Sequence, residues 1–203
     1  MAPTAPVVYV VRHGITDWNM AMRFQGAQDI PINAQGRAQA DSNGLLLRQE
    51  LGASASTFDF VASPLSRTRE TMERVRAAMG LEAKEYRTDD RLIEVCFGDW
   101  EGSTIEELSR SEPDRFRERS EDKWNFQPPG ASSESYEILS WRVAAWFKEI
   151  QRPTVCVSHG GVIRSLFRRI AGMSGEDAAE LIIPQDRVLK IEGRHMHWLP
   201  ADQ

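Results

Sequence analysis

Three short, mostly apolar runs constrain the fold of this sequence most strongly, because each is followed by a polar turn and then by a helical pattern. The runs cover residues 7–11, 58–62 and 154–157 and are rich in β-branched and aromatic side chains. Such runs are typical of strands buried on both faces of a parallel sheet. Their alternation with helices predicts an α/β fold, a three-layer α/β/α sandwich with a mainly parallel central sheet.

The helix after the second strand is marked by apolar spacing and by signals at both ends. Its apolar stripe runs from Leu65 to Met79 and stops at Gly80, a residue type that often ends helices. Ser63 is expected to be the N-cap and Pro64 the first helical residue, since a hydroxyl caps an N-terminus and proline suits the first turn.

Other elements follow from the same signals. Apolar stripes predict helices over residues 139–150 and 162–170. Ser103 and Glu106 have the spacing of a capping box at the start of a further helix. The segment VLKIEG, residues 188–193, predicts an edge strand.

The chain length indicates how these elements are organised. With 203 residues and 41% apolar residues, the chain predicts a single domain over residues 1–203. The segment of about 87–135 is charged, contains tryptophan and has an irregular pattern, so we interpret it as a small helical cap inserted beside the sheet.

Charge and cysteine usage exclude several classes of function. A net charge of −5 with interspersed positive and negative residues argues against a nucleic-acid partner. No segment predicts a membrane span or a secretory signal, and the two cysteines suggest no disulfide framework. We therefore expect a cytoplasmic protein with neither membrane nor nucleic acid as partner. Whether the protein forms a homodimer is left open, since no residue pattern argues for one.

Polar clusters follow all three predicted strands, at the point where each strand ends. Arg12 and His13 follow the first strand, His159 follows the third, and Arg67 lies in the first turn of the helix after the second. Ligands of parallel sheets bind at the carboxyl ends of the strands, where these residues would meet. Two guanidiniums, two imidazoles and a helix N-terminus suit a phosphate dianion.

Such a cluster also suggests a reaction. Nearby positive charge lowers the pKa of a histidine, so that a neutral imidazole can attack phosphorus. The leaving alkoxide then needs a proton, and Glu94 is the candidate acid. Each residue alone has an ordinary structural interpretation, as a turn, a solvated helix residue or a surface carboxylate. The prediction depends on their combination.

Two other features carry little functional signal. His195 and His197 have metal-like spacing, but no carboxylate or cysteine accompanies them, so we expect no metal site. Cys156 lies within an apolar run and is expected to be a buried, inert thiol.

Taken together, the motifs resemble the histidine phosphatase superfamily, also called phosphoglycerate mutase-like. The matching segments occur in the family's order and cover most of the chain: VRHGITDWN (11–19), FQGAQDIPINAQGRAQA (24–40), VASPLSRTRETM (61–72), DDRLIEVCFGDWEG (89–102), PPGASSES (128–135) and VSHGGVIRSL (157–166).

The resemblance implies a phosphoglycerate mutase-like fold with one phosphate pocket and specific residue roles. His13 matches the nucleophile that becomes phosphohistidine, and Glu94 matches the proton donor that later activates water. The family's phosphate clamp corresponds to Arg12, Arg67 and His159. No metal or other cofactor is implied. Further contacts to the phosphate or the substrate are expected from Asn19, Thr16, Gly160, Arg23, Gly26 and Glu134.

Two departures from the family pattern affect these expectations. Ile15 stands where the family usually has Glu or Gln after the RHG motif, which removes a polar group near the site. The usual PPGGES is lengthened to PPGASSES, with Glu134 and Ser135 in the motif's last two places.

The expected function is a metal-independent phosphomonoesterase that acts on a small phosphorylated metabolite through a phosphohistidine. The short chain and the FQG and PPG segments favour the phosphatase branch of the family. A cofactor-dependent phosphoglycerate mutase is the main alternative. A member that binds a phosphorylated ligand or a partner protein without turnover is the other.

Overall fold

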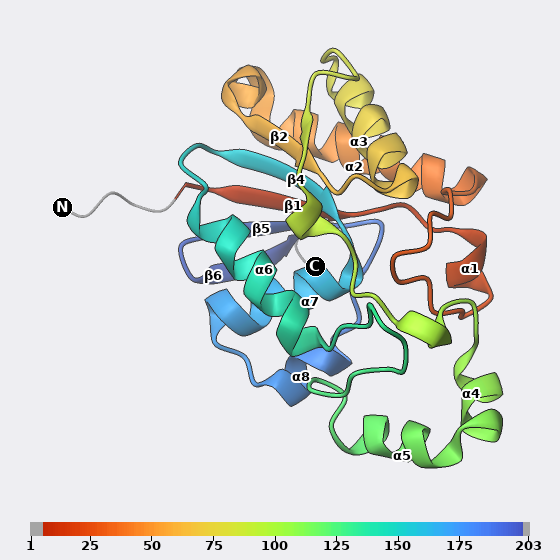
Figure 1. The fold of residues 1–203 in the computed structure, drawn as a ribbon. Coiled ribbons are helices and arrows are strands. Elements are labelled where there is room, and N and C mark those ends of the chain that lie inside the picture. Colours follow the sequence, from red (N-terminus) through yellow and green to blue (C-terminus); the bar gives the residue numbers. More distant parts are fainter. Residues whose placement is uncertain (1–5, 201–203) are drawn as a thin grey trace.

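The computed structural model describes residues 6–200 and contains a six-stranded central sheet covered by helices on both faces (Figure 1). The first four strands in sheet order are parallel to one another. The fifth, β5, pairs antiparallel with β1, and the sixth, β6, pairs antiparallel with β5. This confirms the predicted α/β sandwich with a mainly parallel sheet. The sheet order is β3 (Arg87–Thr88), β2 (Asp59–Ala62), β4 (Thr154–Ser158), β1 (Val8–Arg12), β5 (Val188–Glu192) and β6 (His195–Leu199).

The helices form one layer on each face of the sheet. One face is covered by α2 (Ala34–Leu51) and α3 (Ser66–Met79). The other is covered by α6 (Tyr136–Lys148) and α7 (Gly160–Leu166), which continues as a π-helix over Phe167–Ala171. The remaining elements are α1 (Asp17–Met20), α4 (Ile105–Ser111), α5 (Pro113–Glu121), α8 (Gly175–Glu180) and the 3₁₀ turns Gly52–Thr57, Asp90–Leu92 and Gly98–Trp100.

Strand β1 shows why the apolar runs form central strands. Successive side chains of a strand point to opposite faces of the sheet. Val8 and Val10 belong to the apolar cluster packed with α6 and α7, whereas Tyr9 and Val11 belong to the cluster packed with α2 and α3. All four are at most 3% exposed, so β1 contributes to both core layers at once. Cys156 of β4 is fully buried beside it, as expected.

The predicted start of α3 is wrong by two residues. The N-cap position is Leu65 rather than Ser63, and Pro64 precedes the helix. The capping hydrogen bond comes from a distant loop, since Asp29 Oδ1 accepts from the Ser66 N–H at 2.7 Å. Ser63 is instead tied to β4 through its N–H, which donates to the Val157 carbonyl at 3.0 Å.

Two further local predictions need correction. The capping box of α4 is formed by Thr104 and Glu107, one residue later than Ser103 and Glu106, because Ser103 still belongs to the preceding turn and donates to the Trp100 carbonyl. The segment 188–193 supplies β5, which is not at the edge, since the strand β6 pairs with its outer side.

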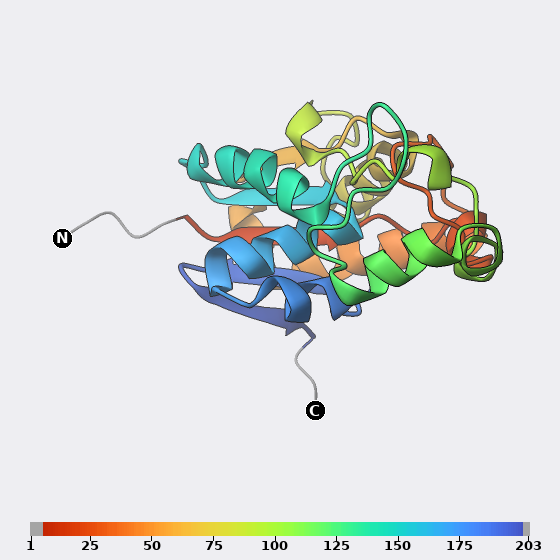
Figure 2. The same cartoon turned by 60° about the horizontal axis from the view of Figure 1, so that its bottom comes forward.

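The segment predicted as a cap lies at the end of the sheet where β1 leads into α1. Helices α4 and α5 project beyond the sheet, with α4 near α1 in both views (Figures 1 and 2). The segment has apolar packing of its own, since the buried Trp100 stacks on Phe126 with ring centroids 5.0 Å apart. Its first two residues form β3 of the sheet, and the division into one domain with a cap stays our interpretation.

Among the helices of residues 6–200, none combines the length and the apolar character needed to cross a membrane.

Candidate active site

The residues predicted to bind phosphate meet at the carboxyl ends of the parallel strands. A pocket with a volume of about 140 Å³ opens there, at the end of the sheet that carries α1 in Figure 1. Its lining residues come from β1, α1, α3, α6 and α7 and from the loops between them. They are Arg12, His13, Asn19, Arg23, Phe24, Gln25, Gly26, Arg67, Glu94, Phe97, Tyr136, Gly160 and Arg164.

His13 lies directly after β1, with one ring nitrogen held by the backbone. Its Nδ1 lies 2.8 Å from the Gly14 carbonyl oxygen. A carbonyl can only accept, so Nδ1 carries the proton and Nε2 keeps its lone pair. The pKa of His13 is well below its ordinary value, chiefly because of burial and further because of the charges of Arg67 and Arg12. His13 is therefore a neutral imidazole with Nε2 available for attack.

Gly14 fixes the loop that carries His13. A Cβ on Gly14 would lie only 2.2 Å from the Gly36 carbonyl oxygen, so no other residue fits where this loop crosses the start of α2. The Gly14 N–H donates to Thr71 Oγ1 of α3 at 3.1 Å. At the next position, the backbone of Ile15 bonds to Asn33 and Gln39, so this departure from the family pattern leaves the loop anchored through its main chain.

The two predicted clamp arginines are held by neutral groups. Arg12 donates to the Ile183 carbonyl at 2.7 Å, and Arg67 donates to the Gly26 and Gln28 carbonyls at 2.7 and 2.5 Å. Within residues 6–200, neither forms an ion pair with a carboxylate. Burial lowers the pKa of both, to about 10 for Arg12, so both remain charged at neutral pH. Carbonyls orient both guanidiniums, and the charge of Glu94, which forms no ion pair with either, partly opposes the effect of burial on their pKa.

His159 completes this cluster at the end of β4. Its ring is fully buried and lies edge to face with His13, with centroids 5.2 Å apart. Nε2 lies 2.8 Å from Ser63 Oγ, while Nδ1 is buried without a hydrogen-bond partner among the described residues. Burial is the largest cause that lowers the pKa of His159, followed by the charge of Arg67.

Glu94 reaches the pocket from the segment that follows β3. Both of its carboxylate oxygens accept from the Gly161 N–H at 3.1 Å, and Oε1 also accepts from the Val95 N–H at 2.9 Å. A Cβ on Gly161 would lie 2.3 Å from Glu94 Oε1. The glycine at the start of α7 is thus what lets this carboxylate lie against the helix.

A second set of hydrogen bonds orients Asn19. Its Oδ1 accepts from the Thr16 N–H and from Gln185 Nε2, both at 3.2 Å, which leaves the Nδ2 amide as the donor end toward a ligand. Gln185 also donates to the His13 carbonyl at 2.9 Å. Thr16 is fully buried, donates to Gln25 at 2.8 Å and does not line the pocket, so it positions its neighbours.

The other predicted contacts divide into two groups. Arg23, Gly26 and Gly160 line the pocket. Glu134 does not, because its carboxylate pairs with Arg142 at 2.7 Å. The lengthened PPGASSES loop closes on itself, with the buried Ser133 hydroxyl donating to the Pro128 carbonyl at 2.5 Å. Thus the loop directs Glu134 toward α6.

Several residues near the pocket were not predicted. Arg164 could have been found by helical spacing, since it lies four positions after Gly160 on the predicted helix and hence on the same face. Ser63 was assigned to capping instead. Gln25 lies within the matched FQG segment, and no pattern in the sequence marks the others, which are Tyr136, Arg142 and Gln185.

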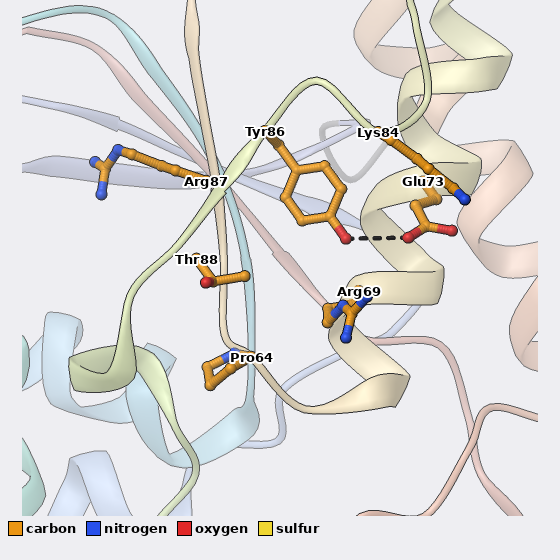
Figure 3. A pocket seen from close by; sticks show the side chains of 7 residues that line it. All are labelled: Pro64, Arg69, Glu73, Lys84, Tyr86, Arg87 and Thr88. Atoms are coloured by element: carbon orange, nitrogen blue, oxygen red, sulfur yellow. Dashed lines mark hydrogen bonds between the residues drawn. The ribbon is translucent and has the colours of Figure 1, made fainter.

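The larger hollow shown in Figure 3 is a less suitable site for the predicted chemistry. Its volume is about 710 Å³, and it lies beside β3, lined by Pro64, Arg69, Glu73, Lys84, Tyr86, Arg87 and Thr88. It contains no histidine, and two of its charged groups, Glu73 and Arg87, have partners. Tyr86 donates to Glu73 at 3.1 Å, and Arg87 pairs with Asp59 at 2.9 Å.

Within residues 6–200, no group of three or more His, Cys, Asp or Glu side chains has a geometry that could hold a metal ion. His195 and His197 lie exposed on the outer strand β6.

An α/β sandwich that gathers two histidines, two arginines and a carboxylate at its strand ends defines an enzyme of the phosphatase and mutase class. The chain belongs to the histidine phosphatase superfamily (branch 1), whose family model matches residues 8–201. Members of this family act on small phosphorylated substrates.

Relatives carry both phosphatase and mutase names. The chain is 32% identical to a probable phosphoglycerate mutase, GpmB, of Salmonella choleraesuis, over 96% of this chain and 88% of that one. It is 32% identical to the uncharacterized phosphatase PhoE of Bacillus subtilis, over 81% and 77%. Among solved structures, a mycobacterial glucosyl-3-phosphoglycerate phosphatase matches with a TM-score of 0.76 and 26% identity, over 91% and 89% of the two chains.

Proposed function

We propose that this protein is a metal-independent phosphomonoesterase for a small phosphorylated metabolite and works through a phosphohistidine at His13. One observation carries the proposal. His13 Nε2 keeps a lone pair, because Nδ1 is bound to the Gly14 carbonyl. The ring shares its pocket with two guanidiniums whose charge no carboxylate pairs with in the described part of the chain.

In the first step, the two arginines hold the phosphate and Nε2 of His13 attacks phosphorus. A P–N bond forms while the P–O bond to the substrate breaks. Arg12, Arg67 and His159 stabilise the charge that develops on the phosphoryl oxygens. Glu94 gives its proton to the leaving alkoxide, which departs as an alcohol.

In the second step, water takes the place of the departed alcohol. Glu94 accepts a proton from the water as the water oxygen attacks phosphorus, and the P–N bond breaks. Inorganic phosphate leaves, and His13 returns to its neutral state. The guanidiniums supply the positive charge that a metal ion supplies in other phosphoryl-transfer sites.

Mutase activity is the second candidate, and it is favoured by the 32% identity to the probable mutase GpmB. The same first step would apply. The phosphoryl group would then return to a bound acceptor hydroxyl instead of water. The two activities therefore differ only in which group Glu94 deprotonates in the second step.

The test is phosphate release from p-nitrophenyl phosphate and a panel of phosphoesters in the presence of EDTA. We expect wild-type protein to release phosphate and His13→Ala to lose almost all of this activity. His195→Ala is the matched control, since it removes an exposed histidine of β6, outside the pocket. Strong inhibition by EDTA would contradict the metal-independent scheme. Turnover of 3-phosphoglycerate with bisphosphoglycerate, without phosphate release, would instead establish the mutase.

A further inference from the structure

The pocket holds more positive charge than one phosphate group needs. Arg12, Arg67 and Arg164 all line it. Each donates to backbone carbonyls, and none forms an ion pair with a carboxylate within the described part of the chain. Carbonyls orient a guanidinium without neutralising its charge. A phosphomonoester dianion matches two of these charges, so one guanidinium is left over.

Arg164 is the arginine that the phosphate clamp does not use. It projects from α7, and its Nη2 donates to the Leu181 carbonyl at 2.8 Å. A Cβ placed on Gly160 would lie 3.3 Å from Arg164 Nη1 and 3.6 Å from Arg12 Nε. The two guanidiniums therefore lie near one point beside α7. Arg164 is thus next to the clamp, and its charge acts on Arg12.

The surroundings of Arg164 favour an anion on this side of the pocket. Its Nε is buried without a partner among the described residues, and its guanidinium lies 5.7 Å from the centre of the Tyr136 ring. Arg119 of α5 is also without an ion pair within residues 6–200, and it lies 5.4 Å from the ring centre of Phe24, which lines the pocket. Arg23 differs from both, since Glu107 pairs with it at 3.1 Å.

We propose that Arg164 binds a second anionic group of the substrate, a carboxylate or a second phosphate, beside the phosphoester held by Arg12 and Arg67. The inference rests on the proposed function, which defines the position of the phosphoester. It narrows the substrate class to phosphomonoesters that carry another negative charge close to the phosphate. Charge-assisted, bidentate recognition of such groups is what arginine does best.

The test measures binding separately from turnover. Dissociation constants are determined by calorimetry in a His13→Ala background for two pairs of esters that differ in one anionic group. The pairs are phosphoglycolate with 2-hydroxyethyl phosphate and 3-phosphoglycerate with glycerol 3-phosphate. We expect the ester with the carboxylate to bind at least about tenfold more tightly than the ester without it in at least one pair.

Substitutions then assign that preference to Arg164. Arg164→Gln is expected to reduce it to about threefold or less, and Arg164→Lys to retain most of it, because the charge remains. Arg168→Gln is the matched control. Arg168 lies one helical turn after Arg164, also donates to a backbone carbonyl, that of Met173, and does not line the pocket. It is expected to keep the full preference. Circular dichroism melting confirms that each variant is folded.

Several outcomes would overturn the inference. They are equal binding of the esters with and without the carboxylate in both pairs, no binding of any ester, or an unchanged preference in Arg164→Gln. An equal loss of affinity for both members of a pair in Arg164→Gln would assign Arg164 to the phosphate itself. Failure of the proposed function would show differently, as absence of phosphate release by the wild type while the binding preference persists.

Discussion

His13 lines the pocket, and the fully buried ring of His159 lies edge to face with it, with ring centroids 5.2 Å apart. They are 3% and 0% exposed, and burial is the largest cause that lowers the pKa of each. Arg67 and Arg12 lower both further. Two neutral imidazoles thus lie side by side among guanidiniums. Protonating either one should lower the free energy of unfolding.

This arrangement predicts that acid destabilises the fold. The unfolded chain binds protons on both histidines below about pH 6.5, whereas the folded chain does not until their lowered pKa values are reached. The free energy of unfolding should therefore fall as pH drops below about 6.5, by up to about 1.4 kcal/mol per pH unit for each histidine. His13→Gln should show a smaller fall, measured by urea unfolding at about pH 7.5 and about pH 5.5.

The exposed His197 provides the control for this comparison. His197→Gln should show the same pH dependence as the wild type, because its side chain lies on the outer strand β6. If His13→Gln and His197→Gln behave alike, His13 is not held neutral by the fold.

Glu94 should matter most for substrates with poor leaving groups. Glu94→Gln cannot donate the proton that an alkoxide needs, whereas p-nitrophenolate leaves without it. We expect a loss of about 10²–10⁴-fold in kcat/KM for alkyl phosphates and a much smaller loss for p-nitrophenyl phosphate. Steady-state kinetics on both substrate types measure the difference. Equal losses on both would argue against proton donation by Glu94.

Gly161→Ala should reproduce much of the Glu94→Gln defect. The added Cβ would lie 2.3 Å from Glu94 Oε1, so the carboxylate has to leave its position at the start of α7. The same selective loss on alkyl phosphates is expected. In the double variant the two losses should not add, because both act on one carboxylate. Fully additive losses would show that Gly161 acts on some other group.

Arg142 should position Glu94 without touching substrate. It donates to the Ile93 and Glu94 carbonyls at 2.6 and 3.1 Å and pairs with Glu134 at 2.7 Å. Arg142→Met leaves these acceptors unpaired, at a cost of about 1–3 kcal/mol in the free energy of unfolding. We also expect a lower kcat for alkyl phosphates with little change in KM. Arg115→Met, in the exposed part of α5, serves as control, and a rise in KM alone would contradict the positioning role.

The ends of the strands were predictable because polar residues interrupt the apolar runs there. Arg12, His13 and His159 each follow such a run. Arg12, His13 and Arg67 line one pocket, and His159 packs against His13 without lining it. The fold class follows from the same pattern. These signals are local in the sequence, and the geometry of parallel strands converts them into neighbours in space.

The features that the sequence did not predict depend on contacts between distant segments. The cap of α3 comes from Asp29 of a distant loop, which frees Ser63 to bond His159. Gln185 reaches His13 from the loop before β5. Helix α2 lacks a strong apolar stripe, because its buried face includes small residues such as Gly36 and Gly44. A Cβ on Gly44 would lie 2.6 Å from the Val75 carbonyl oxygen, so the close packing against α3 requires a side chain too small to signal a core.

The central claim is that His13 carries the phosphoryl group during turnover. The most direct measurement is rapid quenching of the reaction with p-nitrophenyl phosphate into alkaline denaturant, followed by mass spectrometry of the digested peptides. A phosphoryl group on the imidazole of His13, absent in His13→Ala and unchanged in His195→Ala, is the result this account predicts. Phosphate release at full rate from His13→Ala, or a phosphoryl group on another residue, would contradict it.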